Sequence, residues 1–243
     1  MATPNQNFGT SAPSTLTGII GPSTTVASMT PVVYTPFSKT TYGTNNNDVL
    51  TGGLSIDAIY GFDGHDLIFG GASNDHLFGG AGNDTLNGGA GNDVLNGGTG
   101  NDTLNGGTGA DFLSGGPGAD VFVYTNVGES GLTTATADTI SGIDALDHID
   151  VPDWMADHAH TFIVTNLYDS LEQVVRISQN GFWNDRVGMP DATSYQAVMY
   201  YNPTQQTGYL LMDMDCNGYM DTGIIITGLS GQLPENYLDT LLV

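Results

Sequence analysis

An aspartate recurs every nine residues along residues 48–120, and this period limits the possible folds more than any other feature of the chain. The nine positions are Asp48, Asp57, Asp66, Asp75, Asp84, Asp93, Asp102, Asp111 and Asp120. A large apolar residue follows each aspartate by two positions, and a glycine pair precedes most of them by five and four positions. A repeat this short is one structural unit, so neighbouring units must stack to bury a shared core.

The repeating unit reads G-G-x-G-x-D-x-U-x, where U is apolar, and GGAGNDTLN (79–87) is one of its clearest copies. Glycine permits positive φ and close backbone approach, so the first six residues are predicted to form a tight turn with inward carbonyls. The last three residues are predicted to form a short strand that points U into the core. Asparagine at the fifth position is expected to tolerate the turn conformation, as at Asn74, Asn83, Asn92 and Asn101.

Two units would make one coil. The aspartates would then form two rows, and each row would contain every second aspartate of the sequence. Carboxylates stacked about 4.8 Å apart repel one another unless a cation lies between them. Carboxylate and carbonyl oxygens form the hard ligand set that Ca²⁺ prefers, whereas Mg²⁺ requires stricter octahedral geometry. Histidine and cysteine are absent from the repeated positions, which argues against Zn²⁺.

The sequence therefore predicts several Ca²⁺ ions along the array. The predicted ligands are the side chains of Asp57, Asp66, Asp75, Asp84, Asp93, Asp102, Asp111 and Asp120 and the backbone of Gly61, Gly64, Gly70, Gly71, Gly79, Gly80, Gly82, Gly88, Gly89, Gly91, Gly97, Gly98, Gly100, Gly106, Gly107, Gly109, Gly115, Gly116 and Gly118. Burial of one apolar side chain per unit stabilises the fold by much less than the conformational entropy lost when nine residues become ordered. Metal-binding energy must then supply the folding energy, so we expect a chain that is disordered at low calcium and folded at millimolar calcium.

Composition narrows the classes of function. The chain has 3 Lys and Arg against 26 Asp and Glu, a formal net charge of −23, which excludes binding to nucleic acid or an anionic membrane. Its single cysteine, Cys216, excludes an intramolecular disulfide. The first residues lack the basic start and apolar run of a Sec signal peptide, and no run approaches the roughly 18 apolar residues of a transmembrane segment.

Residues 61–123 closely resemble the RTX (repeats-in-toxin) calcium-binding family. The resemblance implies a right-handed parallel β-roll with Ca²⁺ between successive turns. It also implies secretion by a type I apparatus through an uncleaved C-terminal signal, for which the final YLDTLLV is a candidate. LLMDMDCNGYMDTGIIITGL (210–229) resembles the C-terminal strand pair of such proteins, in which an Asp-rich turn joins two strands.

The predicted fold class is all-β, with three parts. Residues 1–42 are a Thr-, Ser- and Pro-rich arm, either a flexible linker or an extended arm in which Val32–Tyr34 adds a strand to a sheet. Residues 43–124 are the β-roll, with a degenerate first coil as an end cap and Val121–Tyr124 as a strand that closes the roll. Residues 125–243 are a β-rich cap with the secretion signal, and its alternating runs are 161–165, 173–178, 195–201, 208–212 and 223–227.

Two further acidic groups are candidate calcium sites. One follows the pattern D-x-D-x-N-G-x-x-D and consists of Asp213, Asp215, Asn217 and Asp221. It resembles the start of an EF-hand loop but has Ile224 in place of the bidentate acid, so a polar hairpin turn is the alternative. The other group, Asp138, Asp144 and Asp147, is a candidate cap for the last calcium row.

No H-E-x-x-H or G-x-S-x-G motif is present, so we expect a protein that is not an enzyme. The first hypothesis is a secreted or cell-surface structural protein, such as a matrix, S-layer-like or filament subunit, that self-associates in calcium. The second is a soluble secreted effector or adhesin that binds a host or a glycan. The third is an accessory module of an extracellular hydrolase or epimerase.

Overall fold

The computed structural model describes residues 39–152, 161–165, 170–171, 197–214, 220–229 and 241–242, with the backbone alone for 161–165. All of them belong to one compact unit, residues 37–243, and a separate unit comprises residues 1–36. Every element whose bounds are described is a β-strand, which confirms the predicted all-β class. Within these residues, no helix is long and apolar enough to cross a membrane.

The strands of the repeats come first. They are β1 (Lys39–Tyr42), β2 (Val49–Gly53), β3 (Asp57–Asp63), β4 (Leu67–Ala72), β5 (His76–Ala81), β6 (Thr85–Ala90), β7 (Val94–Thr99), β8 (Thr103–Thr108), β9 (Phe112–Ser114) and β10 (Val121–Val123). The later strands are β11 (Asp138–Ser141), β12 (His148–Asp150), β13 (Thr161–Thr165), β14 (Ala197–Asn202), β15 (Thr207–Met212) and β16 (Thr222–Thr227).

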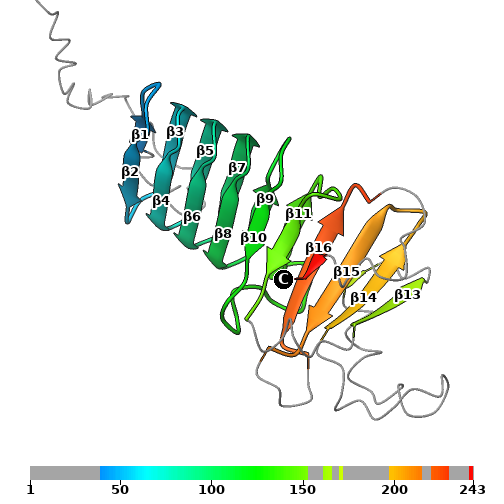
Figure 1. Ribbon diagram of the computed structural model, residues 1–243. Helices are drawn as coiled ribbons and strands as arrows, with labels where there is room; N and C mark the ends of the chain where they lie inside the picture. Colours follow the sequence, from blue (N-terminus) through cyan, green and yellow to red (C-terminus); the bar gives the residue numbers. More distant parts are fainter. Residues whose placement is uncertain are drawn as a thin grey trace, which may run out of the picture. The chain divides into compact units, whose positions relative to one another are not determined.

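The repeats form a parallel β-roll of two sheets (Figure 1). Odd-numbered strands β1 to β9 lie in a ten-stranded sheet, and even-numbered strands β2 to β10 lie in a six-stranded sheet. Each strand pairs with the strand two places later in the chain, as Leu77 pairs with Leu95 and Leu86 with Leu104. Two nonapeptides therefore make one coil, as the sequence predicted.

The apolar residue of each unit lies between the two sheets. These side chains are at most 1% exposed and form one cluster: Ile59, Ile68, Leu77, Leu86, Leu95, Leu104, Leu113 and Phe122. The residues on either side of each one face outward, because successive side chains of a strand point to opposite faces. The nine-residue period thus becomes two columns of buried side chains, one on each sheet.

The strands of the roll are longer than predicted. β6, β7 and β8 each span six residues, the last three of one unit and the first three of the next. The prediction of a six-residue turn and a three-residue strand is therefore wrong. Gly71 and Gly89 pair with each other in the strand ladder although both have positive φ. Glycine can adopt this conformation within a strand because it has no Cβ.

The roll also extends beyond the recognisable units at its N-terminal end. β1 pairs in register with β3, which places Lys39 opposite Asp57 and Thr41 opposite Ile59. Lys39 thus occupies an aspartate position and Thr41 an apolar position. Neither residue matches the motif, so the sequence search missed this strand.

A further coil follows β10. The chain leaves the roll after β10 and returns at β11 and β12, where Ile140 pairs with Leu113 and Ile149 with Phe122. The prediction that Val121–Tyr124 closes the roll is wrong, because Ile140 and Ile149 continue the two apolar columns.

Among the described strands, those that follow β12 all belong to the ten-stranded sheet. β11 pairs with β16 in parallel, β16, β15 and β14 form an antiparallel meander, and β13 joins β14 in parallel. The six-stranded sheet ends at β12, where Ile149 makes an isolated bridge with Leu242. The C-terminal strands match four of the five predicted runs. The fifth run, 173–178, and the predicted arm strand Val32–Tyr34 lie outside the described residues.

Candidate metal centre

The aspartates form two rows, one along each sheet, and each row is joined to the backbone. The backbone N–H of each aspartate donates a hydrogen bond to the Oδ1 atom of the aspartate one coil later. In one row Asp57 donates to Asp75 and Asp75 to Asp93, both at 2.7 Å. In the other row Asp66 donates to Asp84 at 2.8 Å, and the pattern continues to Asp102 and Asp120.

The second oxygen of the inner carboxylates is buried and lacks a protein partner. This holds for Oδ2 of Asp66, Asp75, Asp84, Asp93, Asp102, Asp111 and Asp120, and for Oδ1 of Asp57. All eight side chains are at most 3% exposed. A buried carboxylate without a partner is strongly destabilising, so each of these oxygens requires a positive ligand or a proton.

The unpartnered oxygens converge with backbone carbonyls beside the first glycine of each unit. A Cβ built on Gly70 would lie 2.7 Å from Oδ2 of Asp75 and 2.6 Å from the carbonyl oxygen of Gly88. The same arrangement recurs at Gly61, where Oδ2 of Asp66 and the carbonyl of Gly79 approach. The absence of a side chain at this position leaves a cradle lined by oxygen atoms, which suits a hard cation.

Few basic side chains can neutralise the rows: among the described residues Lys39 is the one Lys or Arg, and it lies opposite Asp57 at the N-terminal end. The three Lys and Arg residues are Lys39, Arg176 and Arg186, so none lies within the aspartate array. Among the described residues, no three His, Cys, Asp or Glu side chains gather at one point. The rows offer few carboxylates to any one cation, so backbone carbonyls would have to complete the ligand set, which matches Ca²⁺ better than Zn²⁺.

Without a cation, six aspartates of the rows between Asp75 and Asp120 bind protons more tightly than an ordinary aspartate. Burial raises the pKa of Asp75 and of Asp102 from an ordinary value of 3.8 to about 6, and neighbouring aspartates add to the rise. Burial, with Asp93 as a neighbour, raises the pKa of Asp111 to about 7. The pKa values of Asp84, Asp93 and Asp120 are also raised, chiefly by burial.

The calcium-free roll is expected to gain stability as pH falls from about 8 to about 4. The folded-state pKa values of Asp75, Asp102, Asp111 and Asp138 lie between about 6 and about 8, above the ordinary 3.8. The folded chain therefore binds more protons across this range, and its stability is lost as pH rises through the folded pKa values. Circular dichroism in calcium-depleted buffer would measure the change.

The matched variant for this prediction is Asp93→Asn, which keeps a hydrogen-bond acceptor and removes the charge. Its calcium-free form should hold more β-structure at pH 8 and depend less on pH. A calcium-free β-signal that grows as pH rises would contradict the sign of the prediction.

The structure divides the candidate glycines by position. Those at the second and fourth positions have positive φ: Gly64, Gly71, Gly80, Gly82, Gly89, Gly91, Gly98, Gly100, Gly107, Gly109, Gly116 and Gly118. Those at the first position line the cradles: Gly61, Gly70, Gly79, Gly88, Gly97, Gly106 and Gly115. The first group combines positive φ with close approach to a backbone carbonyl of the preceding coil, as Gly89 does to Gly71, whereas the second group leaves space beside the aspartate carboxylates. The sequence pattern could not separate these two roles.

The fifth-position asparagines have a role that the sequence reasoning missed. They are not among the residues with positive φ, so their predicted conformational tolerance is not what the turn uses. Each side-chain oxygen instead accepts from a backbone N–H one coil later, as Asn74 does from Asn92 at 2.9 Å and Asn83 from Asn101 at 3.0 Å. His65 takes the same place, and its Nδ1 accepts from Asn83 at 2.7 Å. The recurrence of Asn at one position of successive units was the available signal.

Asp138 and Asp147 continue the two rows into the added coil, and Asp144 does not. Oδ1 of Asp138 accepts from Asp111 N–H at 2.8 Å, and Oδ1 of Asp147 accepts from Asp120 N–H at 2.9 Å. The backbone N–H of Asp144 donates to Oδ2 of Asp147 at 2.7 Å. Burial, together with the charge of Asp111, raises the pKa of Asp138 to about 8.

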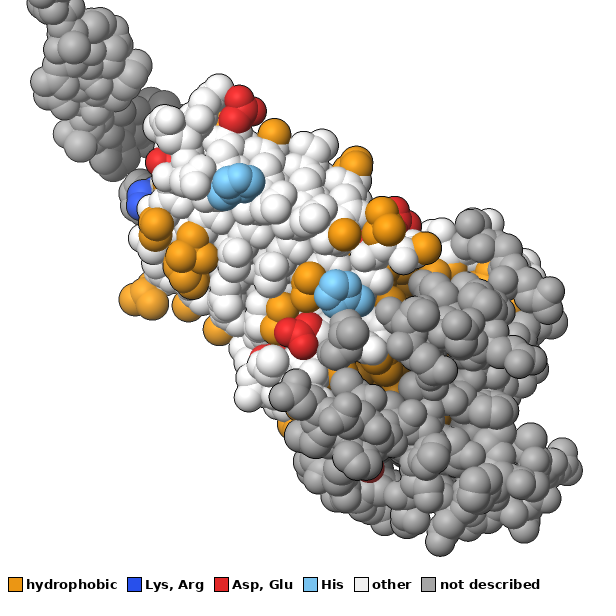
Figure 2. Space-filling view, viewed as in Figure 1, with side chains coloured by type: hydrophobic (Ala, Val, Ile, Leu, Met, Phe, Trp, Pro, Cys, Tyr) orange, Lys and Arg blue, Asp and Glu red, His pale blue; other side chains and the backbone are white. Residues whose placement is uncertain are grey.

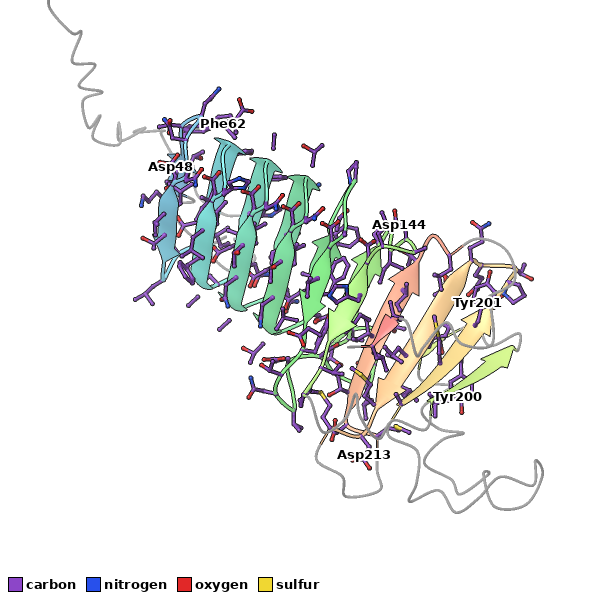
Figure 3. All side chains as sticks on the ribbon, viewed as in Figure 1. Asp48, Phe62, Asp144, Tyr200, Tyr201 and Asp213 are labelled. Atoms are coloured by element: carbon purple, nitrogen blue, oxygen red, sulfur yellow. The ribbon has the colours of Figure 1, made fainter. Side chains whose placement is uncertain are left out.

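The second predicted calcium loop lies at the β15–β16 hairpin and is described in part. Asp213 is buried directly after β15, at the place labelled in Figure 3. Both carboxylate oxygens of Asp221 accept from Met214 N–H, at 3.2 and 3.1 Å. Asp215 and Asn217 lie outside the described residues, so calcium binding here stays a prediction.

Stacked carboxylate rows, oxygen-lined cradles and parallel sheets together define a calcium-binding parallel β-roll. Four overlapping segments match the RTX calcium-binding nonapeptide repeat: residues 42–77, 60–95, 69–104 and 96–124. Residues 42–124 are therefore RTX repeats that form an RTX β-roll. Repeats of this kind are structural calcium-binding modules.

Three solved structures are similar to the chain at low identity. The AlgE6R2 subunit of the Azotobacter vinelandii mannuronan C5-epimerase is 21% identical, with a TM-score of 0.32, over 79% of this chain and 85% of that chain. The AlgE6R3 subunit is 20% identical, with a TM-score of 0.24, over 86% and 83%. The extracellular lipase LipA of Serratia marcescens is 14% identical, with a TM-score of 0.23, over 80% and 38%. No curated protein sequence matches the chain significantly.

Proposed function

We propose that this protein is a secreted calcium-binding protein that folds on meeting extracellular calcium and serves as a non-enzymatic structural or surface subunit. The proposal rests on the two rows of buried aspartates, which contain eight carboxylate oxygens without a protein partner. These oxygens destabilise the folded roll unless cations or protons bind to them, so binding energy becomes folding energy. The RTX repeats support the calcium-dependent step. The resemblance of the final residues to type I signals supports export by that apparatus, because a chain that is unfolded at low calcium can be threaded outward.

The N-terminal end of the roll supports self-association. Six of the nine exposed large apolar side chains among the described residues lie there: Tyr42, Val49, Leu54, Ile56, Phe62 and Phe69. Figure 2 shows hydrophobic side chains exposed at this end, beside basic and acidic side chains at its edge. β1 and β2 are also the edge strands of the two sheets, and an open edge can pair with another chain. End-to-end contact between copies would build a filament, a matrix or an S-layer-like sheet.

Sedimentation of the full chain would test this proposal. We expect particles larger than a monomer in millimolar calcium and a monomer in chelator. Val49→Lys places a charge on an edge strand, at a side chain that is 71% exposed, and should weaken the association. Leu146→Lys, at a side chain that is 65% exposed and far from this end in sequence, is the matched control and should associate normally. A monomer in both conditions would contradict the proposal of a self-associating structural subunit.

A soluble adhesin that binds a host or a glycan is the second candidate. Aromatic rings stack along the outer face of the ten-stranded sheet, with centroids 5.5 Å apart for Tyr42 and Tyr60 and 4.8 Å apart for Tyr60 and Phe78. Exposed apolar patches of this kind mark recognition surfaces. Calcium-dependent binding on a glycan array by a monomeric chain would favour this candidate. Co-purification with an extracellular hydrolase or epimerase would favour an accessory role instead.

A further inference from the structure

Three of the four ends of the aspartate rows differ from the inner members, whereas the fourth end, Asp57, keeps an unpartnered Oδ1. At the N-terminal end of one row, Oδ2 of Asp48 accepts from the backbone N–H and the hydroxyl of Thr44, at 2.6 and 2.9 Å. At the C-terminal end of that row, both oxygens of Asp147 accept from backbone N–H groups, those of Asp120 and Asp144. Protein donors thus stand at both ends of this row, where the inner carboxylates have an unpartnered oxygen.

The C-terminal end of the other row is closed by a tyrosine. Oδ1 of Asp138 accepts from Asp111 N–H, as in every inner coil, but Oδ2 accepts from the Tyr124 hydroxyl at 2.9 Å. Tyr124 is 1% exposed and Asp138 is fully buried. In the preceding coil, Oδ2 of Asp111 has no protein partner. The hydroxyl therefore supplies at Asp138 the positive contact that the inner coils lack.

A second chain of hydrogen bonds holds this end to the C-terminal sheet. The backbone N–H of Asp138 donates to Ser130 Oγ at 2.7 Å, and that hydroxyl donates to the carbonyl oxygen of Gly223 at 2.6 Å. Ser130 is fully buried, and Gly223 belongs to β16, the strand that pairs with β11. Each polar atom in this series of hydrogen bonds has a protein partner, so the geometry at this end of the row does not require a metal ion.

We propose that the Tyr124 hydroxyl terminates the calcium row of the ten-stranded sheet, so that Asp138 lies in the row without serving as a calcium ligand. The inner aspartates Asp75, Asp93 and Asp111 bind calcium, and the row stops at Asp138. This inference rests on the proposed calcium binding and adds where that binding ends. The end coil is then a metal-independent surface on which the calcium-loaded coils stack.

Counting bound ions by native mass spectrometry on the full chain in saturating calcium tests the assignment. Asp138→Asn keeps an acceptor for Asp111 N–H and a polar partner for Tyr124, and we expect it to bind as many calcium ions as the wild type. Asp93→Asn is the matched inner variant and should bind at least one ion fewer. Loss of an ion from Asp138→Asn would overturn the inference and leave the proposed function intact. A wild type that binds no calcium would overturn both.

Thermal unfolding in saturating calcium provides a second readout. Tyr124→Phe removes only the hydroxyl and leaves Oδ2 of Asp138 buried without a donor, so the unfolding temperature should fall. Adding Asp138→Asn to this variant removes the buried charge and should restore part of the loss. Tyr60→Phe, a tyrosine of the outer aromatic stack, is the control and should unfold like the wild type. Failure of the second substitution to rescue the first would count against the proposed pairing.

Discussion

Removing calcium from the folded protein at pH 8 is expected to unfold the β-roll completely. The chain would then have to bury eight carboxylate oxygens that have no protein partner, in a region without Lys or Arg. Each unpaired buried charge costs several kcal/mol, whereas whole domains are stable by only about 5–15 kcal/mol. Circular dichroism and amide hydrogen exchange in calcium and in chelator would measure the loss, and the backbone N–H groups of the aspartate rows should lose their protection first.

Two substitutions of the same chemical kind make this prediction specific to the rows. Asp93→Asn removes one inner carboxylate and should raise the calcium concentration at the folding midpoint by roughly tenfold or more, because site affinity follows ligand charge. Asp63→Asn alters an exposed aspartate outside the rows, which accepts a hydrogen bond from Asn45 at 2.8 Å, and should leave the midpoint unchanged. Replacing calcium by magnesium should restore little structure. Equal β-content with and without calcium at pH 8 would refute the calcium-dependent fold.

Gly100→Ala is expected to destabilise the roll strongly although it adds a single methyl group. Gly100 has a φ of 126°, and a Cβ there would overlap the carbonyl oxygen of Gly82 in the preceding coil. The backbone strain alone costs about 1–2 kcal/mol. The overlap is with backbone, so relief requires the two coils to separate and the ladder between them to break. We expect a total loss of several kcal/mol, measured as a higher calcium midpoint and a lower unfolding temperature.

Gly128→Ala separates strain from overlap. Gly128 has a φ of 86°, but a Cβ there would meet no atom within 4 Å. Its substitution should therefore cost only the strain, about 1–2 kcal/mol. Phe62 shows that a side chain can occupy a second position at the open N-terminal end, with a φ of 79°. If Gly100→Ala and Gly128→Ala had equal effects, the close stacking of coils would not be what the glycines provide.

Most of the roll could be predicted from the sequence because its contacts repeat with the sequence. A buried residue such as Leu95 contacts its own equivalents at Leu77 and Leu113, one coil away on either side. The sequence pattern therefore identifies the residues that are neighbours in the tertiary structure. The strand bounds and the asparagine ladder were missed, because they depend on which backbone groups face each other across coils. The motif shows residue types and carries no record of hydrogen-bond direction.

The contacts at the ends of the rows could not be predicted in this way, although Asp138, Asp144 and Asp147 were candidates for a cap. The spacing between Tyr124 and Asp138 does not follow the nine-residue period. The two side chains come into contact because the polypeptide leaves the roll after β10 and returns at β11. Lys39 lies opposite Asp57 without resembling it. Such contacts depend on the path of a connecting segment, and no period encodes that path.

The sequence by itself determined the coil of two nonapeptides, the two aspartate rows, the buried apolar columns and the assignment as calcium-binding repeats, because each of these follows from a strict local period. The sequence offered Asp138, Asp144 and Asp147 as a candidate cap, but only the tertiary structure decided that Asp138 and Asp147 continue the rows and that Asp144 does not. It also decided that protein donors meet three of the four row ends and that one sheet continues into the C-terminal strands. The physical reason is that a repeat specifies contacts between identical neighbours, whereas its termination requires contacts with groups that are not repeated.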